Sequence, residues 1–275
     1  MESSQNKNSS GVASLIVSII LAAAAAAFVS ATYHRNSVWN DPPSMWADAA
    51  AKSPGKARPH YNLATVLADA GRLDEAMKEN NRAVELYPNY AKAHFNIGAI
   101  YHVRGRVDEA IEKYKLAIAL QPEIVAAHNN LGYAYYSKGL FEKAMEEYNA
   151  ALSIKPSHVQ TYINIGYVYR DLKRPEDAIS AYREALRYAP KTALAYYLIG
   201  EAHLTEERFD MAAGDFKAAI GIDPGSAEAH NGLGKALERT GRRNEALAEY
   251  STALDLNPDL SDARENIKRL RGVVR

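Results

Sequence analysis

Apolar residues recur with helical spacing over most of the chain, and short polar turns separate one helical stretch from the next. Turns such as 70–72 and 138–140 join two such stretches into one unit. Acidic residues such as Asp74 and Glu75 open most of the second stretches, where they favour the positive end of the helix dipole. The pattern therefore predicts an all-α fold built from two-helix units.

The two-helix units repeat every 34 residues, and several columns of equivalent positions keep that period. The prolines alone show the period of 34 residues, at Pro54, Pro88, Pro122, Pro156, Pro190, Pro224 and Pro258. A column of small residues on the first helix consists of Ala64, Gly98, Gly132, Gly166, Gly200 and Gly234. A column on the second helix, mostly aromatic, consists of Asn80, Tyr114, Tyr148, Tyr182, Phe216 and Tyr250. So many columns in one register identify a repeat protein.

In these columns the chain resembles the tetratricopeptide repeat (TPR) family, from Ala57 to Pro258. The resemblance implies a right-handed TPR superhelix, which is an α-solenoid whose groove binds other proteins. Three positions depart locally from the family pattern, namely Asn80 in the aromatic column and Lys173 and Glu207 at turns that usually hold glycine. The six expected repeats span 57–90, 91–124, 125–158, 159–192, 193–226 and 227–260.

Glycine in a helix costs about 1 kcal/mol relative to alanine, so the glycine column needs a compensating packing reason. We expect each small residue of the first helix to face a small alanine of the second helix, at a close helix–helix approach. We expect the aromatic residue to fill the space between units. A half-repeat within 34–56, with a helix at 44–52, and a C-terminal helix within 261–275 are expected to cap the two ends.

The N-terminal region predicts a membrane anchor. Residues 1–11 form a polar tail that is expected to be disordered, and 12–33 carry no charge. At about 1.5 Å per residue, 12–33 span roughly 33 Å, which is enough to cross a bilayer core. The chain is thus expected to be single-pass, with 12–33 as an uncleaved signal anchor. The alternative is a signal peptide cleaved after 29–31, and the flanking charges do not determine the orientation.

The linker resembles a narrower group of proteins. Residues 33–36, Trp39, Trp46 and 52–63 look like the junction in multi-span, glycosyltransferase-like membrane proteins that carry C-terminal TPRs. In that group the TPRs lie on the exoplasmic side, so the resemblance implies that the repeats here face the periplasm or another exoplasmic space. No transferase domain remains once the repeats and the apolar segment are subtracted, and we therefore expect no enzymatic activity.

Composition narrows the possible partners. Lys plus Arg and Asp plus Glu both number 33, and this zero net charge argues against nucleic-acid binding and against attachment to anionic lipid. The absence of cysteine excludes disulfides, zinc–thiolate sites and cysteine nucleophiles. No phosphate loop or nucleophile motif occurs, so no small-molecule cofactor is expected. Four histidines in one column are interpreted as packed residues rather than metal ligands: His60, His94, His128 and His230.

A column of asparagines lies on the first helices, one residue before a buried Leu/Ile column. An amide both donates and accepts, so such a ladder can hold the backbone of an extended peptide regardless of its sequence. The spacing resembles the asparagine ladder of O-linked N-acetylglucosamine transferases. The alternative is that these amides satisfy neighbouring helices. The ladder comprises Asn62, Asn96, Asn130 and Asn164, and it breaks at Leu198 and Gly232.

Further groove positions follow from their spacing relative to the buried columns, and Tyr and Arg are frequent at binding hot spots. Tyr133 and Tyr167 are interpreted as groove residues, with packing between repeats as the alternative, whereas Tyr135 and Tyr169 are assigned to the packing. The clamp with which some TPRs bind carboxylates is expected to be absent, since neutral residues such as Tyr61 hold its positions. The candidates are Phe95, His102, Tyr133, Tyr136, Tyr167, Arg170 and Tyr197.

These features predict a non-enzymatic, membrane-anchored scaffold that binds a protein or an extended peptide in its groove, for the assembly of a membrane or envelope complex. The alternative is a fixed accessory subunit of a larger membrane complex, held through the outer face or the membrane segment. Fold alone does not decide between these roles.

Overall fold

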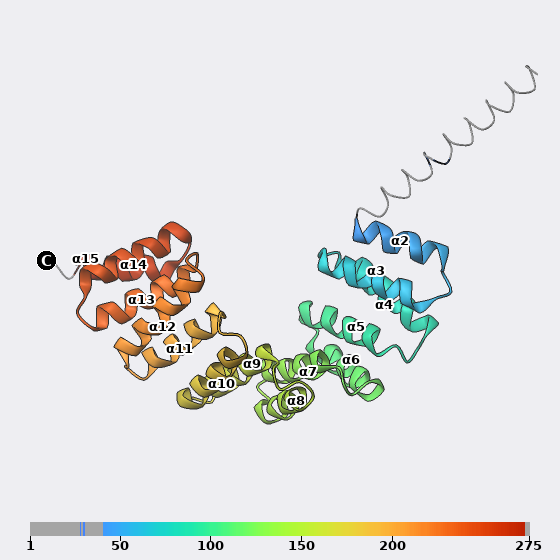
Figure 1. The fold of residues 1–275 in the computed structure, drawn as a ribbon, viewed down its shortest axis with the longest axis horizontal. Helices are drawn as coiled ribbons and strands as arrows, with labels where there is room; N and C mark the ends of the chain where they lie inside the picture. Colours follow the sequence, from blue (N-terminus) through green and yellow to red (C-terminus); the bar gives the residue numbers. More distant parts are fainter. Residues whose placement is uncertain (1–27, 29, 31–40, 273–275) are drawn as a thin grey trace, which may run out of the picture. The chain divides into compact units, whose positions relative to one another are not determined.

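The computed structural model describes residues 41–272, together with Phe28 and Ser30. Every regular element within 41–272 is an α-helix, and no strand occurs in that range (Figure 1). The helices are α2 (Pro42–Lys52), α3 (Ala57–Asp69), α4 (Leu73–Leu86), α5 (Ala91–Val103), α6 (Val107–Leu120), α7 (Val125–Ser137), α8 (Phe141–Ile154), α9 (Val159–Asp171), α10 (Pro175–Tyr188), α11 (Ala193–Thr205), α12 (Phe209–Ile222), α13 (Ala227–Arg239), α14 (Arg243–Leu256) and α15 (Ser261–Gly272).

The predicted tail at 1–11 and the predicted membrane span at 12–33 lie outside the described residues, apart from Phe28 and Ser30. Among the helices that the structure does describe, none is long and apolar enough to cross a lipid bilayer. The anchor, its cleavage and its orientation therefore stay predictions.

The chain divides into two compact units, one ending at Arg104 and the other beginning at Gly105. In the first unit α2 packs on α3, and α4 packs between α3 and α5. In the second unit the helices pair in chain order, from α7 with α8 to α13 with α14, with α6 against α7 and α15 against α14. This arrangement confirms the predicted all-α solenoid of two-helix repeats.

Local sequence signals set the helix ends. α2 begins after Asp41, whose Oδ2 accepts hydrogen bonds from the Ser44 backbone N–H at 3.1 Å and from Ser44 Oγ at 2.8 Å. The turns between paired helices contain a residue in the left-handed region, such as Gly71 with a φ of 73°. Lys173 and Glu207 adopt φ values of 59° and 57° in the equivalent turns. The turn therefore keeps its left-handed conformation at the two positions where another residue replaces glycine.

The glycine column exists because an aromatic ring lies directly on it. A Cβ atom added at Gly200 would lie 2.8 Å from Cε1 of Phe216, and one at Gly132 would lie 2.6 Å from Cε1 of Tyr148. The expectation that these glycines face the alanine column did not include this ring, which is the nearest neighbour of the added atom. The alanine column takes a lesser part, because the Ala144 carbonyl oxygen would lie 3.1 Å from the added atom at Gly132.

The first repeat departs from the pattern in both the glycine column and the aromatic column. It has Ala64 where the later repeats have glycine, and Asn80 where they have an aromatic ring. An alanine methyl would collide with a ring, so the two exceptions belong together. Asn80 is fully buried, and neither polar atom of its amide has a hydrogen-bond partner among the residues described. The core of this unit is instead aliphatic and includes Ala50, Leu63, Leu67, Ala76 and Ile100.

Candidate functional site

The first helices of the repeats approach each other more closely than the second helices do. α3 contacts α5 in the first unit, and in the second unit α7 contacts α9 and α11 contacts α13. No comparable contact joins successive second helices within 41–272. The side chains that the first helices expose form a surface in each unit, here called the first-helix wall.

Four predicted site residues meet on the first-helix wall of the second unit. Tyr136 Oη donates a hydrogen bond to Oδ2 of Asp171 at 2.6 Å and accepts one from Nη2 of Arg170 at 3.1 Å. Arg170 Nε also donates to Oδ1 of Asp171 at 2.9 Å, and its guanidinium carbon lies 5.0 Å from the ring centroid of Tyr167. The ring of Tyr133 lies 5.9 Å from that of Tyr136. These five residues are here called the tyrosine–arginine cluster.

Hydrogen bonds set the charges within the tyrosine–arginine cluster. Burial, and then the hydrogen bond to Asp171, raise the pKa of Tyr136 to about 12, so its hydroxyl stays protonated at neutral pH. Burial alone would raise the pKa of Asp171, but the hydrogen bonds from Tyr136 and Arg170 outweigh it, and the pKa is lowered. The guanidinium and the carboxylate neutralise each other, and the cluster therefore presents aromatic faces rather than a net charge.

The two tyrosines interpreted as groove residues differ in exposure. Tyr133 is 42% exposed. Tyr167 is half-buried, and its ring makes an edge contact with the buried ring of Tyr182, with centroids 6.3 Å apart. Tyr133 thus offers the larger surface to a ligand, and Tyr167 also packs between repeats.

The asparagine column joins neighbouring first helices. Asn164 Nδ2 donates to Oδ1 of Asn129 at 3.0 Å, and Thr161 Oγ1 donates to the same oxygen at 2.9 Å. In the first unit Asn96 Nδ2 donates to Oγ1 of Thr65 at 3.2 Å. The predicted ladder is corrected at Asn164, which is only 4% exposed and whose amide donates to Asn129 on α7 and accepts from Gln160 on its own helix.

The other three asparagines of the column are less buried than Asn164. Asn62, Asn96 and Asn130 are all half-buried. Asn130 Oδ1 accepts a hydrogen bond from Asn129 Nδ2 at 3.2 Å, and its amide also interacts with the Tyr114 hydroxyl. A role of Asn62, Asn96 and Asn130 in binding stays a prediction.

The remaining candidates fall in both units. Phe95 and His102 are half-buried on α5, in the first unit, and burial lowers the pKa of His102, so its imidazole is neutral at pH 7. Tyr197, in the second unit, packs on Phe216 with ring centroids 5.9 Å apart, and burial raises its pKa to about 12. In the second unit Tyr133, Tyr136, Tyr167 and Arg170 come together in one cluster.

A pocket of about 440 Å³ opens between α9 and α11. These two helices approach each other less closely than α7 approaches α9 or α11 approaches α13. Arg170 and Asp171 border the pocket from α9, Tyr182 from α10, and Tyr197 and Glu201 from α11. Glu201 is half-buried, and this burial raises the pKa of its carboxyl. The pocket adjoins the tyrosine–arginine cluster through Arg170.

Sequence reasoning missed Asp171 and Glu201. Glu201 stands one repeat after Tyr167 and two after Tyr133, so the column that selected those tyrosines also contains it. Asp171 has no such signal, because only the fold brings it beside Tyr136.

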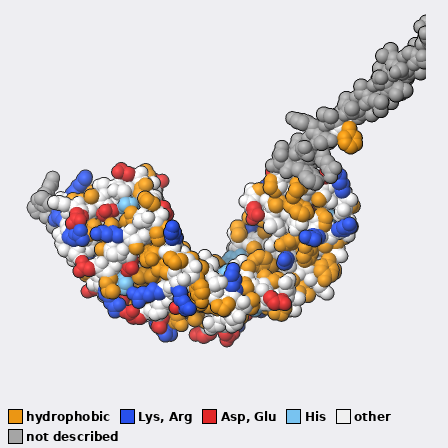
Figure 2. All heavy atoms as spheres, in the orientation of Figure 1, with side chains coloured by type: hydrophobic (Ala, Val, Ile, Leu, Met, Phe, Trp, Pro, Cys, Tyr) orange, Lys and Arg blue, Asp and Glu red, His pale blue; other side chains and the backbone are white. Residues whose placement is uncertain are grey.

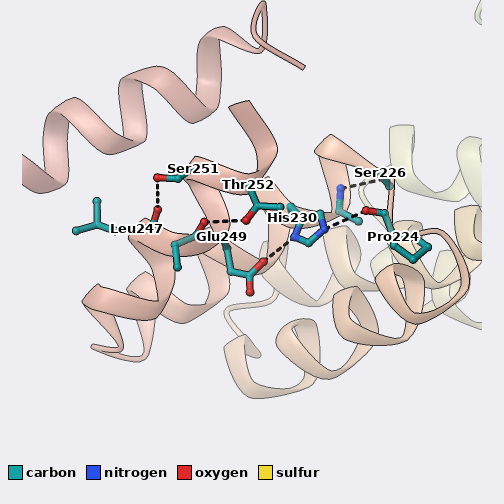
Figure 3. Close-up of polar contacts among 9 residues, drawn as sticks. Pro224, Ser226, His230, Leu247, Glu249, Ser251 and Thr252 are labelled. Carbon is teal, nitrogen blue, oxygen red and sulfur yellow. Dashed lines mark hydrogen bonds and ion pairs between the residues drawn. The ribbon is translucent and has the colours of Figure 1, made fainter. Parts of the chain in front are cut away.

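The histidine column links the two helices of a repeat. His230 Nδ1 lies 2.7 Å from Oε2 of Glu249 on the second helix, and Nε2 lies 3.4 Å from the Pro224 carbonyl oxygen in the preceding turn (Figure 3). His60 and His128 make the equivalent pairs of contacts. These ring nitrogens act within the repeat, and no group of three or more His, Asp or Glu in the described part of the chain is placed to hold a metal ion.

Charged side chains are mixed over the surface. On the face drawn in Figure 2, basic and acidic side chains lie interspersed with apolar ones in each unit. Several pair locally at the start of a second helix, as Arg72 does with Glu75 at 2.7 Å and Arg106 with Glu109 at 2.7 Å. Exposed pairs of this kind contribute little, so they do not mark a site.

One curated relative matches part of the chain. A protein O-mannosyl-transferase of Caenorhabditis elegans is 36% identical over 62 residues, which make up 22% of this chain and 9% of that protein. The chain therefore spans about a tenth of the length of this relative.

Solved structures match far more of the chain. The Cut9 and Hcn1 hetero-tetramer of APC/C gives a TM-score of 0.71 at 17% identity, covering 86% of this chain and 46% of the other. YrrB, described as a TPR protein with an unusual peptide-binding site, gives a TM-score of 0.54 at 23% identity, covering 69% of this chain and 97% of the other. Identities this low establish a shared fold.

Family models match the repeats directly. A TPR repeat model matches residues 65–103, 100–139 and 132–172. Two tetratricopeptide repeat models match 163–227 and 203–270. Residues 65–270 of this chain therefore belong to the tetratricopeptide repeat family.

Proposed function

We propose that this protein is a scaffold that binds an extended segment of another protein along its first-helix wall, without catalysis. The observation that carries the proposal is the tyrosine–arginine cluster, in which the exposed ring of Tyr133 lies beside Tyr136, Tyr167 and Arg170. Tyr and Arg are enriched at binding hot spots, because they offer large contact areas and several hydrogen bonds. A pocket next to the cluster adds a place for one side chain of the segment.

The cluster is held in place before any ligand binds. Asp171 accepts hydrogen bonds from both Tyr136 and Arg170, which fixes the ring and the guanidinium relative to each other. A surface ordered in advance loses less entropy on binding than a flexible one. The structural likeness to YrrB and to the Cut9 and Hcn1 assembly supports a protein as the partner.

The membrane part of the function rests on the sequence. The proposal includes an anchor at 12–33 with the repeats on the exoplasmic side, so that the bound segment is held at a membrane or envelope complex. The resemblance of the linker to glycosyltransferase-like membrane proteins supports this side of the membrane.

Peptide selection tests the binding function. The full-length chain in non-ionic detergent selects from a displayed library of random peptides, and the affinities of enriched peptides are then measured by fluorescence anisotropy. Tyr133→Ala is expected to weaken them about tenfold. Tyr87→Ala is the matched control, since Tyr87 is 54% exposed and lies at the end of α4. The proposal fails if no peptide is enriched, or if the two variants weaken binding equally.

One observation favours the alternative of a fixed subunit in a larger complex. The last residues of α8, α10, α12 and α14 form an exposed apolar column, with Ile154 40%, Tyr188 37%, Ile222 37% and Leu256 43% exposed. Ile222→Lys with Leu256→Lys would remove the protein from such a complex, as measured by native gel electrophoresis of solubilised membranes. The first-helix wall would be untouched, so peptide binding separates the two functions.

A further inference from the structure

We propose that the pocket between α9 and α11 receives a basic side chain, lysine or arginine, of the bound protein segment, and that Glu201 is its counter-ion. This inference rests on the proposed binding function and specifies the chemistry of the segment. The residues that carry it are Glu201, Tyr182, Tyr197 and Leu198.

Glu201 is the unusual group in the pocket. It is half-buried on α11, and no hydrogen bond or ion pair reaches its carboxylate from any residue that the structure describes. Burial raises the pKa of this carboxyl. A partly buried carboxylate without a partner is destabilising, and a cation that enters the pocket removes that penalty.

No cation near Glu201 in the described part of the chain is hydrogen-bonded or ion-paired to it. Arg170 is hydrogen-bonded to Asp171. Lys173 also lines the pocket and acts electrostatically on Asp171. Lys235, on α13, is the strongest charge acting on Glu201, but its Nζ lies 3.7 Å from a carboxylate oxygen of Asp262 on α15. The pocket therefore leaves the Glu201 carboxylate open to a further cation at short range.

The rest of the pocket suits the stem of a long basic side chain. Tyr182 and Tyr197 present aromatic rings, and Leu198 and Ala202 present aliphatic groups. Lys and Arg bury their methylene stems against such surfaces while the charged head reaches a polar group. The Tyr182 hydroxyl is buried and has no hydrogen-bond partner within 41–272, so the pocket retains an unused polar atom beside these apolar walls.

The repeat pattern shows which residues take the position of Glu201 in the neighbouring repeats. The column that contains Tyr133 and Tyr167 continues with Glu201 and then Lys235. Along one wall the same position thus changes from an aromatic ring to an acid. A segment lying across α7, α9 and α11 would meet two rings and then a carboxylate, which favours an apolar or aromatic side chain followed by a basic one.

The test compares peptide selections with the full-length chain, with Glu201→Gln and with Glu146→Gln. Glu146 is the matched control, because it is exposed on α8, a second helix, and undergoes the same change of charge. We expect wild type and the control to enrich peptides that contain Lys or Arg. Glu201→Gln is expected to lose that preference and to bind the enriched basic peptides about tenfold more weakly.

The outcomes separate this inference from the function on which it rests. If wild type enriches no peptide, the binding function itself is overturned and the pocket assignment falls with it. If wild type enriches peptides without Lys or Arg, or if Glu201→Gln keeps the basic preference, binding stands and the pocket assignment is wrong. Enrichment of acidic peptides that depends on Glu201 would also overturn it. Thermal melts of each variant confirm that differences in binding are not differences in folding.

Discussion

The α7–α9 and α9–α11 junctions lie one repeat apart and use equivalent positions in different ways. At the first junction Asn129 accepts hydrogen bonds from Thr161 and Asn164, and the two helices are in close contact. At the second the equivalent positions are buried and apolar, and the pocket opens between the helices. Those positions are Ile163, Ala195 and Leu198.

The asparagine pair also occurs at a third junction, where the two helices are not in close contact. Between α13 and α15 the asparagine pair returns, with Asn266 Nδ2 donating to Oδ1 of Asn231 at 3.2 Å. Side-chain hydrogen bonds hold two helices at a defined separation, whereas apolar contacts tolerate a range of separations. The side chains at these positions thus differ between the α7–α9 junction, which is in close contact, and the α9–α11 junction, which leaves room for a ligand.

Breaking the closed junction has the largest expected effect on stability. Asn129→Ile leaves the buried Asn164 amide without its acceptor, and we expect a loss of about 2 kcal/mol in the free energy of unfolding. Thermal melts would show a decrease of several degrees in Tm. Asn149→Ile is the control, because Asn149 is exposed on α8. Equal effects of the two changes would show that the hydrogen bonds at the junction are unimportant.

Transplanting the open junction sharpens the comparison. The triple variant Asn129→Ile, Thr161→Ala and Asn164→Leu places the residues of the α9–α11 junction between α7 and α9. The polar groups left without these partners belong to His158, Gln160 and Asn130, none of which is fully buried. We therefore expect its stability to lie within about 1 kcal/mol of wild type. Amide hydrogen exchange in α7 and α9 should become faster as the junction loosens. A triple variant less stable than Asn129→Ile would contradict this account.

The α13–α15 junction carries a pH-dependent contribution to stability. Burial alone would raise the pKa of Glu238, but hydrogen bonds from Arg269 and Tyr250 outweigh it and lower the pKa below its usual 4.5. A lowered pKa means stability that is present above pH 4.5 and is lost as the pH falls through the folded-state value. Glu238→Gln should cost about 0.5–1 kcal/mol at pH 7 and less at pH 3, as measured by urea titration. A difference that grows in acid would contradict this.

The open junction should show the opposite sign, with the smallest effect. Burial raises the pKa of Glu201, so its charged form destabilises the fold at neutral pH, and that penalty disappears as the pH falls through the raised pKa. Glu201→Gln should therefore gain up to about 0.5 kcal/mol at pH 7 and nothing near pH 3, in the same titrations. A loss of stability at pH 7 would mean that Glu201 has a partner within the protein.

The fold was largely predictable, because the repeat columns report on packing inside each unit. The period, the helix pairs and the small residues at close helix–helix approaches all follow from spacing. The partner of the glycine column was not predictable, since a glycine fits against either an alanine or a ring. At Gly200 the structure decides for the ring of Phe216.

The candidate site was predictable only in part. Tyr133, Tyr136, Tyr167 and Arg170 follow from column spacing, and the structure brings them together. The orientation of Asn164 did not follow, because it depends on a polar residue in the preceding repeat rather than on its own column. Contacts between repeats are decided by pairs of columns, and a single column does not contain that information.

Site-specific photo-cross-linking tests the central claim most directly. A benzophenone amino acid replaces either Tyr133, on the first-helix wall, or Tyr188, which is similarly exposed at the end of α10, a second helix. The full-length chain is irradiated in the cells that express it, and cross-linked segments are identified by mass spectrometry. The account predicts adducts to an extended segment of a partner protein from position 133 and none from position 188. Adducts from position 188 alone would contradict it and favour the outer face as the interface.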